Sequence, residues 1–341
     1  MSSAETINDT KSSDTSIVFV NPVGAIGGAE RALLTIIAAL KTAQPHLQLH
    51  LIVGTDGLLV EMAQNLGVQV RLLKLPDQLN QLGDSSLKSN SQPLQGTPGK
   101  SKIQNYITLL LNVAKALPSV AQYLGEFRQA IREINPDLIH SNGIKTHLLT
   151  ALAGSMDVPV VWHIHDFYGS RPLMAGVLRW MSTRATLGIA ISEAVAQDAK
   201  ATLPGLPIEV IYNSVDTHYF SPGIQERFTE KYYSPSDSVT RSSNPIRVGL
   251  VATFARWKGH DIFLQAAARV IRAYPNFNVR FYIVGGAIYQ TKGSQFSEQE
   301  LKELAVALQI ENDVEFLGFQ SDIAEVYRWL DIVVHASTQP E

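Results

Sequence analysis

The 341-residue sequence contains no cysteine. This absence excludes disulfide bonds, thiolate metal sites and a cysteine nucleophile, and it is compatible with a reducing cytoplasm. An excess of basic residues is also missing, because 28 Lys and Arg residues stand against 31 Asp and Glu residues. The formal net charge of −3 therefore argues against a general nucleic-acid-binding protein.

Long hydrophobic runs are lacking as well. No stretch of about 18 consecutive apolar residues occurs, so the sequence predicts no transmembrane helix. The first 15 residues are polar and have no apolar core, and we expect a disordered tail there and not a signal peptide. With 45% hydrophobic and 17% charged residues, the chain is typical of a globular protein, and its length suits two domains.

The first part of the chain alternates β-type runs with segments of helical period, which is the rhythm of an α/β domain with a parallel sheet. We expect strands at residues 16–20, 47–53, 68–73, 137–140 and 158–161, and helices at 29–40, 58–66 and 103–134. Pro118 lies inside the last of these helices and is expected to split or kink it. Residues 77–104 are rich in Gln, Asn, Ser, Gly and Pro and predict a mobile insertion, either near a substrate or as a variable loop without chemistry.

Glycines gather in the loop between the first expected strand and helix. Gly24, Gly27 and Gly28 allow positive φ angles and let a ligand approach the backbone at a helix start. The G-x-G-x-x-G spacing of dinucleotide-binding loops is absent, so the loop is a weak fingerprint of that kind. A tight turn without any ligand is the alternative interpretation.

Two histidines follow the expected strand at 158–161. His163 and His165 alternate, so they share a face of an extended backbone, and Asp166 is placed to orient an imidazole or to cap the next helix. A zinc site needs further ligands at suitable spacing, and none is evident. The alternative is that these are packed or surface histidines.

A basic amphipathic stretch, residues 170–184, follows. It carries three arginines and no acidic residue, a pattern that is compatible with peripheral contact to anionic lipid. Packing of its apolar stripe inside a domain is the alternative interpretation.

The second half repeats the βα rhythm after a polar, Ser-rich connection. We expect strands at residues 246–251, 279–284, 314–317 and 331–335, with helices starting near Ile262 and at two capping sequences, Ser297 with Glu300 and Asp322 with Glu325. Arg256 and Lys258 lie in the turn between the first of these strands and its helix. A phosphate is the expected ligand of such a turn, whereas solvated loop charges are the alternative.

Several motifs together resemble family 4 glycosyltransferases. They are residues 248–260, 210–216 and 281–286, together with the Gly-Gly-Ala-Glu sequence at residues 27–30. The resemblance implies the GT-B fold, an α/β architecture of two Rossmann-like domains facing a cleft. The acceptor-side domain would span residues 16–212, the connection 213–245 and the donor-binding domain 246–341. The family commonly has an Arg five residues before the Lys, where this chain has Thr253, and we expect Arg256 to take its place.

The resemblance also implies an activity, namely retaining transfer of a hexose from a nucleotide diphosphate sugar to a hydroxyl of a glycan or glycolipid. No cofactor and no metal would be required. Arg256 and Lys258 would hold the diphosphate, and His165 would reach the reacting region of the sugar. Gly27 and Gly28 would lie in the loop that faces the acceptor and the donor phosphate. We expect a cytoplasmic protein, with peripheral contact to the inner face of the membrane as an option.

The end of the sequence, Pro340 and Glu341, also resembles the start of the family's E-x7-E motif. Glu341 corresponds to its first acid, which faces the donor sugar, and the second acid has no counterpart. The resemblance therefore implies a donor domain that is incomplete at its C-terminus. A non-catalytic remnant that binds a glycan or a partner is the alternative function, and an NAD-dependent oxidoreductase is a weaker one. No pair of carboxylates suited to hydrolysis is apparent, which disfavours a glycosidase.

Overall fold

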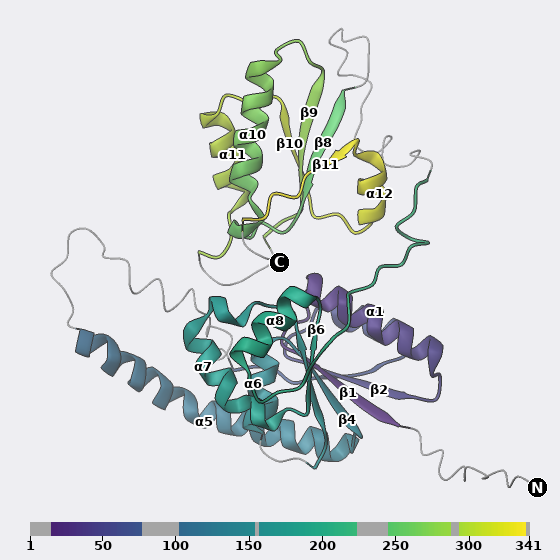
Figure 1. Cartoon of the computed structure of the whole chain (residues 1–341), viewed down its shortest axis with the longest axis vertical. Coiled ribbons are helices and arrows are strands. Elements are labelled where there is room, and N and C mark those ends of the chain that lie inside the picture. The colour runs from purple at the N-terminus through teal and green to yellow at the C-terminus, as the bar shows by residue number, and fades with distance from the viewer. Residues whose placement is uncertain (1–14, 77–101, 154–156, 224–244, 288–292, 339–341) are drawn as a thin grey trace, which may run out of the picture. The chain divides into compact units, whose positions relative to one another are not determined.

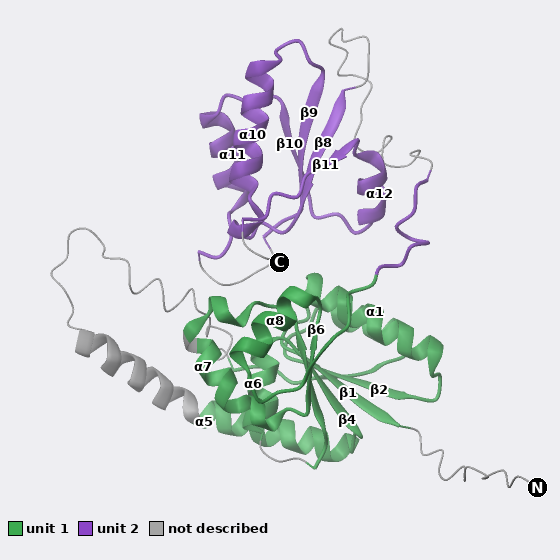
Figure 2. Ribbon diagram, viewed as in Figure 1, with its two compact units in different colours: residues 1–214 green, residues 215–341 purple. Residues whose placement is uncertain are grey.

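The computed structural model describes residues 15–76, 102–153, 157–223, 245–287 and 293–338. The chain forms two compact units, which divide between Ser214 and Val215 (Figure 2). Each unit is built on a parallel β-sheet with helices packed against it (Figure 1). The two sheets agree with the expectation of two Rossmann-like domains.

The described part of unit 1 contains a seven-stranded sheet in the order β3-β2-β1-β4-β5-β6-β7. Its strands are β1 (Ser16–Asn21), β2 (Gln48–Val53), β3 (Gln69–Leu72), β4 (Leu138–Asn142), β5 (Val160–Ile164), β6 (Leu187–Ala190) and β7 (Ile208–Val210). All of the neighbouring pairs are parallel. Because parallel strands need crossover connections, each of the first six is followed by a helix.

The helices of unit 1 cover both faces of the sheet. They are α1 (Gly28–Ala43), α2 (Leu58–Asn65), α5 (Lys102–Ile134), α6 (Ile144–Leu152), α7 (Pro172–Met181) and α8 (Glu193–Thr202). Val18 and Val20 of β1 belong to the buried cluster that includes α5, α6, α7 and α8, whereas Phe19 belongs to the cluster with α1 and α2. Alternate residues of one strand thus supply two cores, as expected for a sheet that is buried on both faces.

Three details of unit 1 differ from the sequence-based expectations. Helix α5 is continuous through the exposed Pro118, so Pro118 does not split it, and the expected kink stays a prediction; buried Phe127 and Ile131 anchor its C-terminal half. It begins at Lys102, so the end of the expected 77–104 insertion is helical, and residues 77–101 lie outside the described residues. Strand β5 continues to Ile164 because its residues up to this point pair with β6, so the expected end at residue 161 is wrong.

The described part of unit 2 contains a four-stranded parallel sheet in the order β10-β9-β8-β11. Its strands are β8 (Ile246–Val251), β9 (Val279–Val284), β10 (Val314–Gly318) and β11 (Ile332–Val333). Strand β11 is shorter than expected, because only two residues pair, and they pair with β8 alone. Its side chains are half exposed, at 50% for Ile332 and 48% for Val333.

Helices cover both faces of this sheet too (Figure 1). Helices α10 (His260–Ala273) and α11 (Glu298–Ala307) pack on one face, and α12 (Ile323–Trp329) packs on the other. Both capping predictions are confirmed, since Ser297 accepts a hydrogen bond from the Glu300 N–H and Asp322 accepts one from the Glu325 N–H. Part of the expected connection also packs on unit 2, because the Arg328 side chain donates to the carbonyl of Ser221.

Candidate functional site

Each sheet has a switch point, where the strand order reverses and helices leave in opposite directions. In unit 1 the switch point lies between β1 and β4, and in unit 2 it lies between β8 and β11. Open α/β sheets bind ligands at the carboxyl ends of the strands at such points. Asn21 and Asn142 end β1 and β4, and the turn with Arg256 and Lys258 follows β8. The predicted turn with Arg256 and Lys258, and the predicted glycine loop that follows β1, therefore lie where the topology favours ligand binding.

The glycine loop of unit 1 enters α1 without a side-chain cap on the helix start. The Gly27 N–H donates to Glu30 Oε2 at 3.0 Å, so it is already satisfied within the protein. A side chain at Gly28 would meet no heavy atom within 4 Å, so this position is open. Of the two predicted glycines, Gly28 is the better placed to let a ligand approach the backbone.

A chain of hydrogen bonds links this loop to His165. His165 Nε2 lies 2.7 Å from Asn142 Oδ1, and Asn142 Nδ2 donates to Asn21 Oδ1 at 2.7 Å. Asn21 Nδ2 in turn donates to Glu30 Oε1 at 3.3 Å. Both asparagines are 1% exposed and Glu30 is 9% exposed, and burial raises the pKa of the Glu30 carboxyl. Gly27 and His165 thus belong to one network.

Four histidines lie close together at this network, and His165 is one of them. His163 and His165 share a face as expected, with ring centroids 4.1 Å apart, and His140 packs edge-on against His163 at 5.1 Å. His147 stacks on Trp162 at 4.8 Å. Burial lowers the pKa of His140 and His165 to about 4 and that of His163 to about 2, and it lowers the pKa of His147 well below the usual value. All four rings are therefore neutral at pH 7.

Asp166 does not take the expected part as a helix cap. Its carboxylate forms an ion pair with Arg171 at 3.5 Å, and neither short helix that follows is capped by a side chain. Asn142 is the residue that orients the His165 ring. Within the described residues, no group of three or more His, Asp or Glu side chains is arranged to hold a metal ion.

The turn that contains Arg256 and Lys258 in unit 2 contacts the segment that leads into α11. Arg256 forms an ion pair with Glu300 at 2.8 Å, and its guanidinium lies 4.3 Å from the centre of the Phe296 ring. Glu300 uses its other carboxylate oxygen to accept the Ser297 N–H in the capping box. The Arg256 N–H donates to the carbonyl of Ser294 at 3.0 Å. Side chain and backbone of Arg256 are thus both positioned by residues 294–300.

The same turn also packs against the residues that follow β11. Gly259 has φ 72°, and a Cβ there would lie 2.0 Å from the carbonyl oxygen of Ala336. The Thr338 N–H donates to the carbonyl of Trp257 at 2.8 Å. Lys258 lies in the short helical turn with Arg256, and Glu341 lies outside the described residues. The two predicted cations are therefore brought together, next to the chain that leads towards Glu341.

Helix α7 covers most of the basic amphipathic stretch. Arg179 donates to the carbonyl of Thr202, so this arginine and Arg171 both have partners within unit 1. Val177 and Trp180 are 41% and 75% exposed. Of the helices in the described part of the chain, none is both long and apolar enough to cross a membrane.

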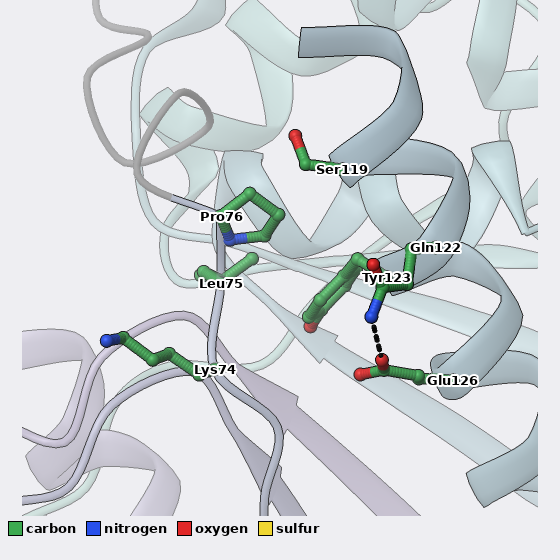
Figure 3. Close-up of a pocket in the computed structure, with 7 residues that line it drawn as sticks. All are labelled: Lys74, Leu75, Pro76, Ser119, Gln122, Tyr123 and Glu126. Atoms are coloured by element: carbon green, nitrogen blue, oxygen red, sulfur yellow. Dashed lines mark hydrogen bonds between the residues drawn. The ribbon is translucent and has the colours of Figure 1, made fainter.

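A pocket of about 300 Å³ lies elsewhere in unit 1 (Figure 3). It is lined by Lys74, Leu75, Pro76, Ser119, Gln122, Tyr123 and Glu126. Pro76 directly precedes residues outside the described ranges, and the pocket contains none of the predicted site residues. We assign it no ligand.

Sequence reasoning missed the residues that support the predicted ones. They are Asn21, Glu30 and Asn142 in unit 1, and Phe296 and Glu300 as partners of Arg256 in unit 2. A signal existed in unit 1, because Asn21 and Asn142 are polar residues that directly end apolar strands. No comparable signal marks the pairing of Arg256 with Glu300, which are 44 residues apart.

Comparison with solved structures confirms the fold class, GT-B with two Rossmann-like domains. HepE of Anabaena, in complex with UDP and glucose, is 24% identical with a TM-score of 0.69, covering 95% of this chain and 75% of that chain. Sucrose-phosphate synthase of Thermosynechococcus elongatus is 14% identical with a TM-score of 0.66, over 95% of this chain and 75% of that chain. At such identities the likeness concerns the fold alone.

A curated relative gives a partial match. D-inositol 3-phosphate glycosyltransferase of Corynebacterium urealyticum is 33% identical over 133 residues, which are 38% of this chain and 30% of that protein. The match therefore spans less than a third of the relative's length.

Two family models together match most of the chain. One described as Glycosyltransferase Family 4 matches residues 26–219, which is more than half of the 341 residues. Another, described as Glycosyl transferases group 1, matches residues 245–341. The chain therefore belongs to the family 4 glycosyltransferases.

Proposed function

We propose that this protein transfers a hexose from a nucleotide diphosphate sugar to a hydroxyl of a glycan or glycolipid, with retention at the anomeric carbon. The observation that carries the proposal is the placement of Arg256 and Lys258 together in the turn at the switch point of unit 2. Positive side chains beside a helix start form a favourable site for a diphosphate. HepE, which shares the fold, binds UDP-glucose in its crystal structure.

The residues have distinct parts in this proposal. Arg256 and Lys258 neutralise the charge that develops on the leaving diphosphate, which is electrostatic stabilisation of the transition state. His165 contacts the sugar near the reacting carbon, as a neutral ring. Gly28 lets the donor approach the backbone, and Glu341 binds sugar hydroxyls. No metal and no cofactor take part.

Calorimetry with a matched pair of variants tests the donor site. Lys258→Ala removes one charge-assisted contact and should weaken UDP-glucose binding by about 1.5–3 kcal/mol, or roughly 10- to 150-fold. Arg272→Ala removes a charge from the last turn of α10 and is the control, which should bind like the wild type. GDP-mannose is tested beside UDP-glucose, because the donor base is not determined by these residues.

Two results would count against the proposal. Unchanged affinity in Lys258→Ala would show that the diphosphate site is assigned wrongly. Tight donor binding without transfer to any glycan or glycolipid acceptor would favour the alternative, a non-catalytic binding protein.

A further inference from the structure

In the hydrogen-bond network at the switch point of unit 1, the donor and the acceptor of each bond can be assigned. Asn21 Nδ2 lies 2.7 Å from the carbonyl oxygen of Val23, and a carbonyl oxygen can only accept a hydrogen bond. This contact places the amide nitrogen of Asn21 towards Val23 and Glu30, and its oxygen towards Asn142. The reversed amide would set two oxygens against each other at this contact.

The second amide is oriented in the same way. Asn142 Nδ2 donates to Asn21 Oδ1 at 2.7 Å and lies 3.4 Å from the carbonyl oxygen of Ala29. Both of these neighbours are acceptors, so the nitrogen of Asn142 must face them. Its oxygen therefore faces His165 Nε2, at 2.7 Å, and can only accept.

The orientation of the amides decides the tautomer of His165. The atom that donates to Asn142 Oδ1 must be Nε2–H, and in a neutral imidazole the other nitrogen then carries a lone pair. The ring is neutral because burial lowers its pKa to about 4. Nδ1 has no hydrogen-bond partner among the described residues, and the side chain is only partly buried.

We infer that Asn21 and Asn142 are positioning residues that hold His165 as the Nε2–H tautomer, so that Nδ1 accepts a hydrogen bond from a hydroxyl of the donor sugar. The role of Nδ1 rests on the proposed function, whereas the tautomer does not. Both asparagines are buried at the ends of neighbouring strands, so neither amide can rotate without leaving a buried polar group unsatisfied.

The tautomer is measured on the full chain without any ligand. Long-range proton–nitrogen NMR spectra of protein labelled with ¹⁵N-histidine distinguish a protonated ring nitrogen from one with a lone pair, and His165→Gln assigns the signals. We expect Nε2 protonated and Nδ1 unprotonated at pH 7. An Nδ1–H tautomer in the wild type would overturn the inference, whether or not any variant folds.

Variants then test the positioning. Asn142→Leu removes the acceptor, so the ring should become a mixture of tautomers. Asn142→Asp loses the donor to Asn21 Oδ1 but keeps an acceptor oxygen towards His165, and it should keep Nε2 protonated. Asn65→Leu, at an exposed residue that ends α2, is the control and should leave the spectrum unchanged. A wild-type spectrum in Asn142→Leu, in a variant whose circular dichroism shows a native fold, would contradict the inference.

Titration with UDP and with UDP-glucose tests the role of Nδ1. The Nδ1 signal should shift with UDP-glucose and stay in place with UDP, because UDP lacks the sugar. If calorimetry shows that UDP-glucose binds while the Nδ1 signal does not move, the inferred contact is wrong and the proposed function stands. If neither UDP-glucose nor GDP-mannose binds, the proposed function fails together with the contact, and the tautomer is still judged by the ligand-free spectrum.

Discussion

The buried histidines of unit 1 predict that acid destabilises this unit more steeply than unit 2. Burial lowers the pKa of His140 and His165 to about 4 and that of His163 to about 2, and the pKa of His147 is also well below its usual value. In the unfolded chain, histidine titrates near pH 6.5. Each of these side chains therefore takes up a proton on unfolding at pH 5, and the free energy of unfolding rises with pH in this range.

The magnitude follows from the linkage relation. The contribution of each buried, neutral histidine to the free energy of unfolding is complete above the pKa of the unfolded side chain. It is lost as the pH falls towards the pKa of the folded side chain. One proton corresponds to about 1.4 kcal/mol per pH unit, and an unfolded imidazole is only half protonated at about pH 6.5. Each histidine therefore costs about 1.6 kcal/mol between about pH 6.5 and about pH 5, and four of them cost up to about 6 kcal/mol. This is comparable to the whole stability of a typical domain, about 5–15 kcal/mol. Glu30, whose pKa burial raises, opposes the trend, whereas His50 of β2, whose pKa is lowered by burial and by Lys41, adds to it.

Hydrogen exchange followed by mass spectrometry measures this effect for each unit separately. Unit 2 is the internal reference, because among its described residues His260 is the one histidine with a lowered pKa, at about 4. Peptides of β1, β4 and β5 should lose protection between pH 6.5 and pH 5 several times more steeply than those of β8 and β9. The intrinsic pH dependence of exchange is corrected for in both sets.

A single variant makes the test sharper. His140→Phe replaces a ring that contacts Phe19 and whose buried Nε2 has no hydrogen-bond partner in the described part of the chain. The variant should lose about one proton of uptake on unfolding, and its free energy of unfolding should gain about 2 kcal/mol over the wild type at pH 5 relative to pH 7.5. The reasoning would be refuted if the free energy of unfolding changed equally with pH in the two units, or in the wild type and this variant.

Two further predictions concern the turn of unit 2. Glu300→Gln keeps the capping box but removes the charge that pairs with Arg256, so UDP-glucose affinity should rise by about two- to five-fold at low salt in calorimetry, and a fall would contradict this competition. Gly259→Ala places a Cβ on the carbonyl of Ala336 at φ 72°, so it should cost at least about 1–2 kcal/mol in the hydrogen-exchange stability of unit 2. Gly286→Ala, where the added Cβ would meet no heavy atom of the described residues within 4 Å, is the control, and equal losses in both variants would show that the close approach is unimportant.

Much of the fold could be predicted because its signals are local. The β-type runs at 246–251 and 279–284 became β8 and β9 with the expected bounds, and both helix caps formed as expected. A strand or a cap depends on residues a few positions apart, and their spacing is visible in the sequence. The ends of β5 and β11 were missed, because pairing with neighbouring strands decides where a strand stops.

The candidate site could be predicted only in part. The sharing of a face by His163 and His165 followed from alternation along one strand, and the structure confirms it. The donor-binding roles of Arg256, Lys258, Gly27 and Gly28 stay predictions, as do those of His165 and Glu341. Glu30 accepts the Gly27 N–H from only three residues away, but Gly27 lacks the side chain of a capping-box residue, so the sequence carried no clear signal of this contact.

By itself the sequence determined the α/β class, the family and which polar or charged residues stand at each strand end. Periodicity, helix caps and motifs depend on residues close together in the sequence, so they can be recognised without the structure. The tertiary structure alone decided which of these residues meet. Asn21 and Asn142 are 121 residues apart, and only the crossing of the chain at the switch point brings their amides together. The direction of that hydrogen-bond network, and with it the tautomer of His165, depends on burial and on contacts between distant strands, which no local pattern encodes.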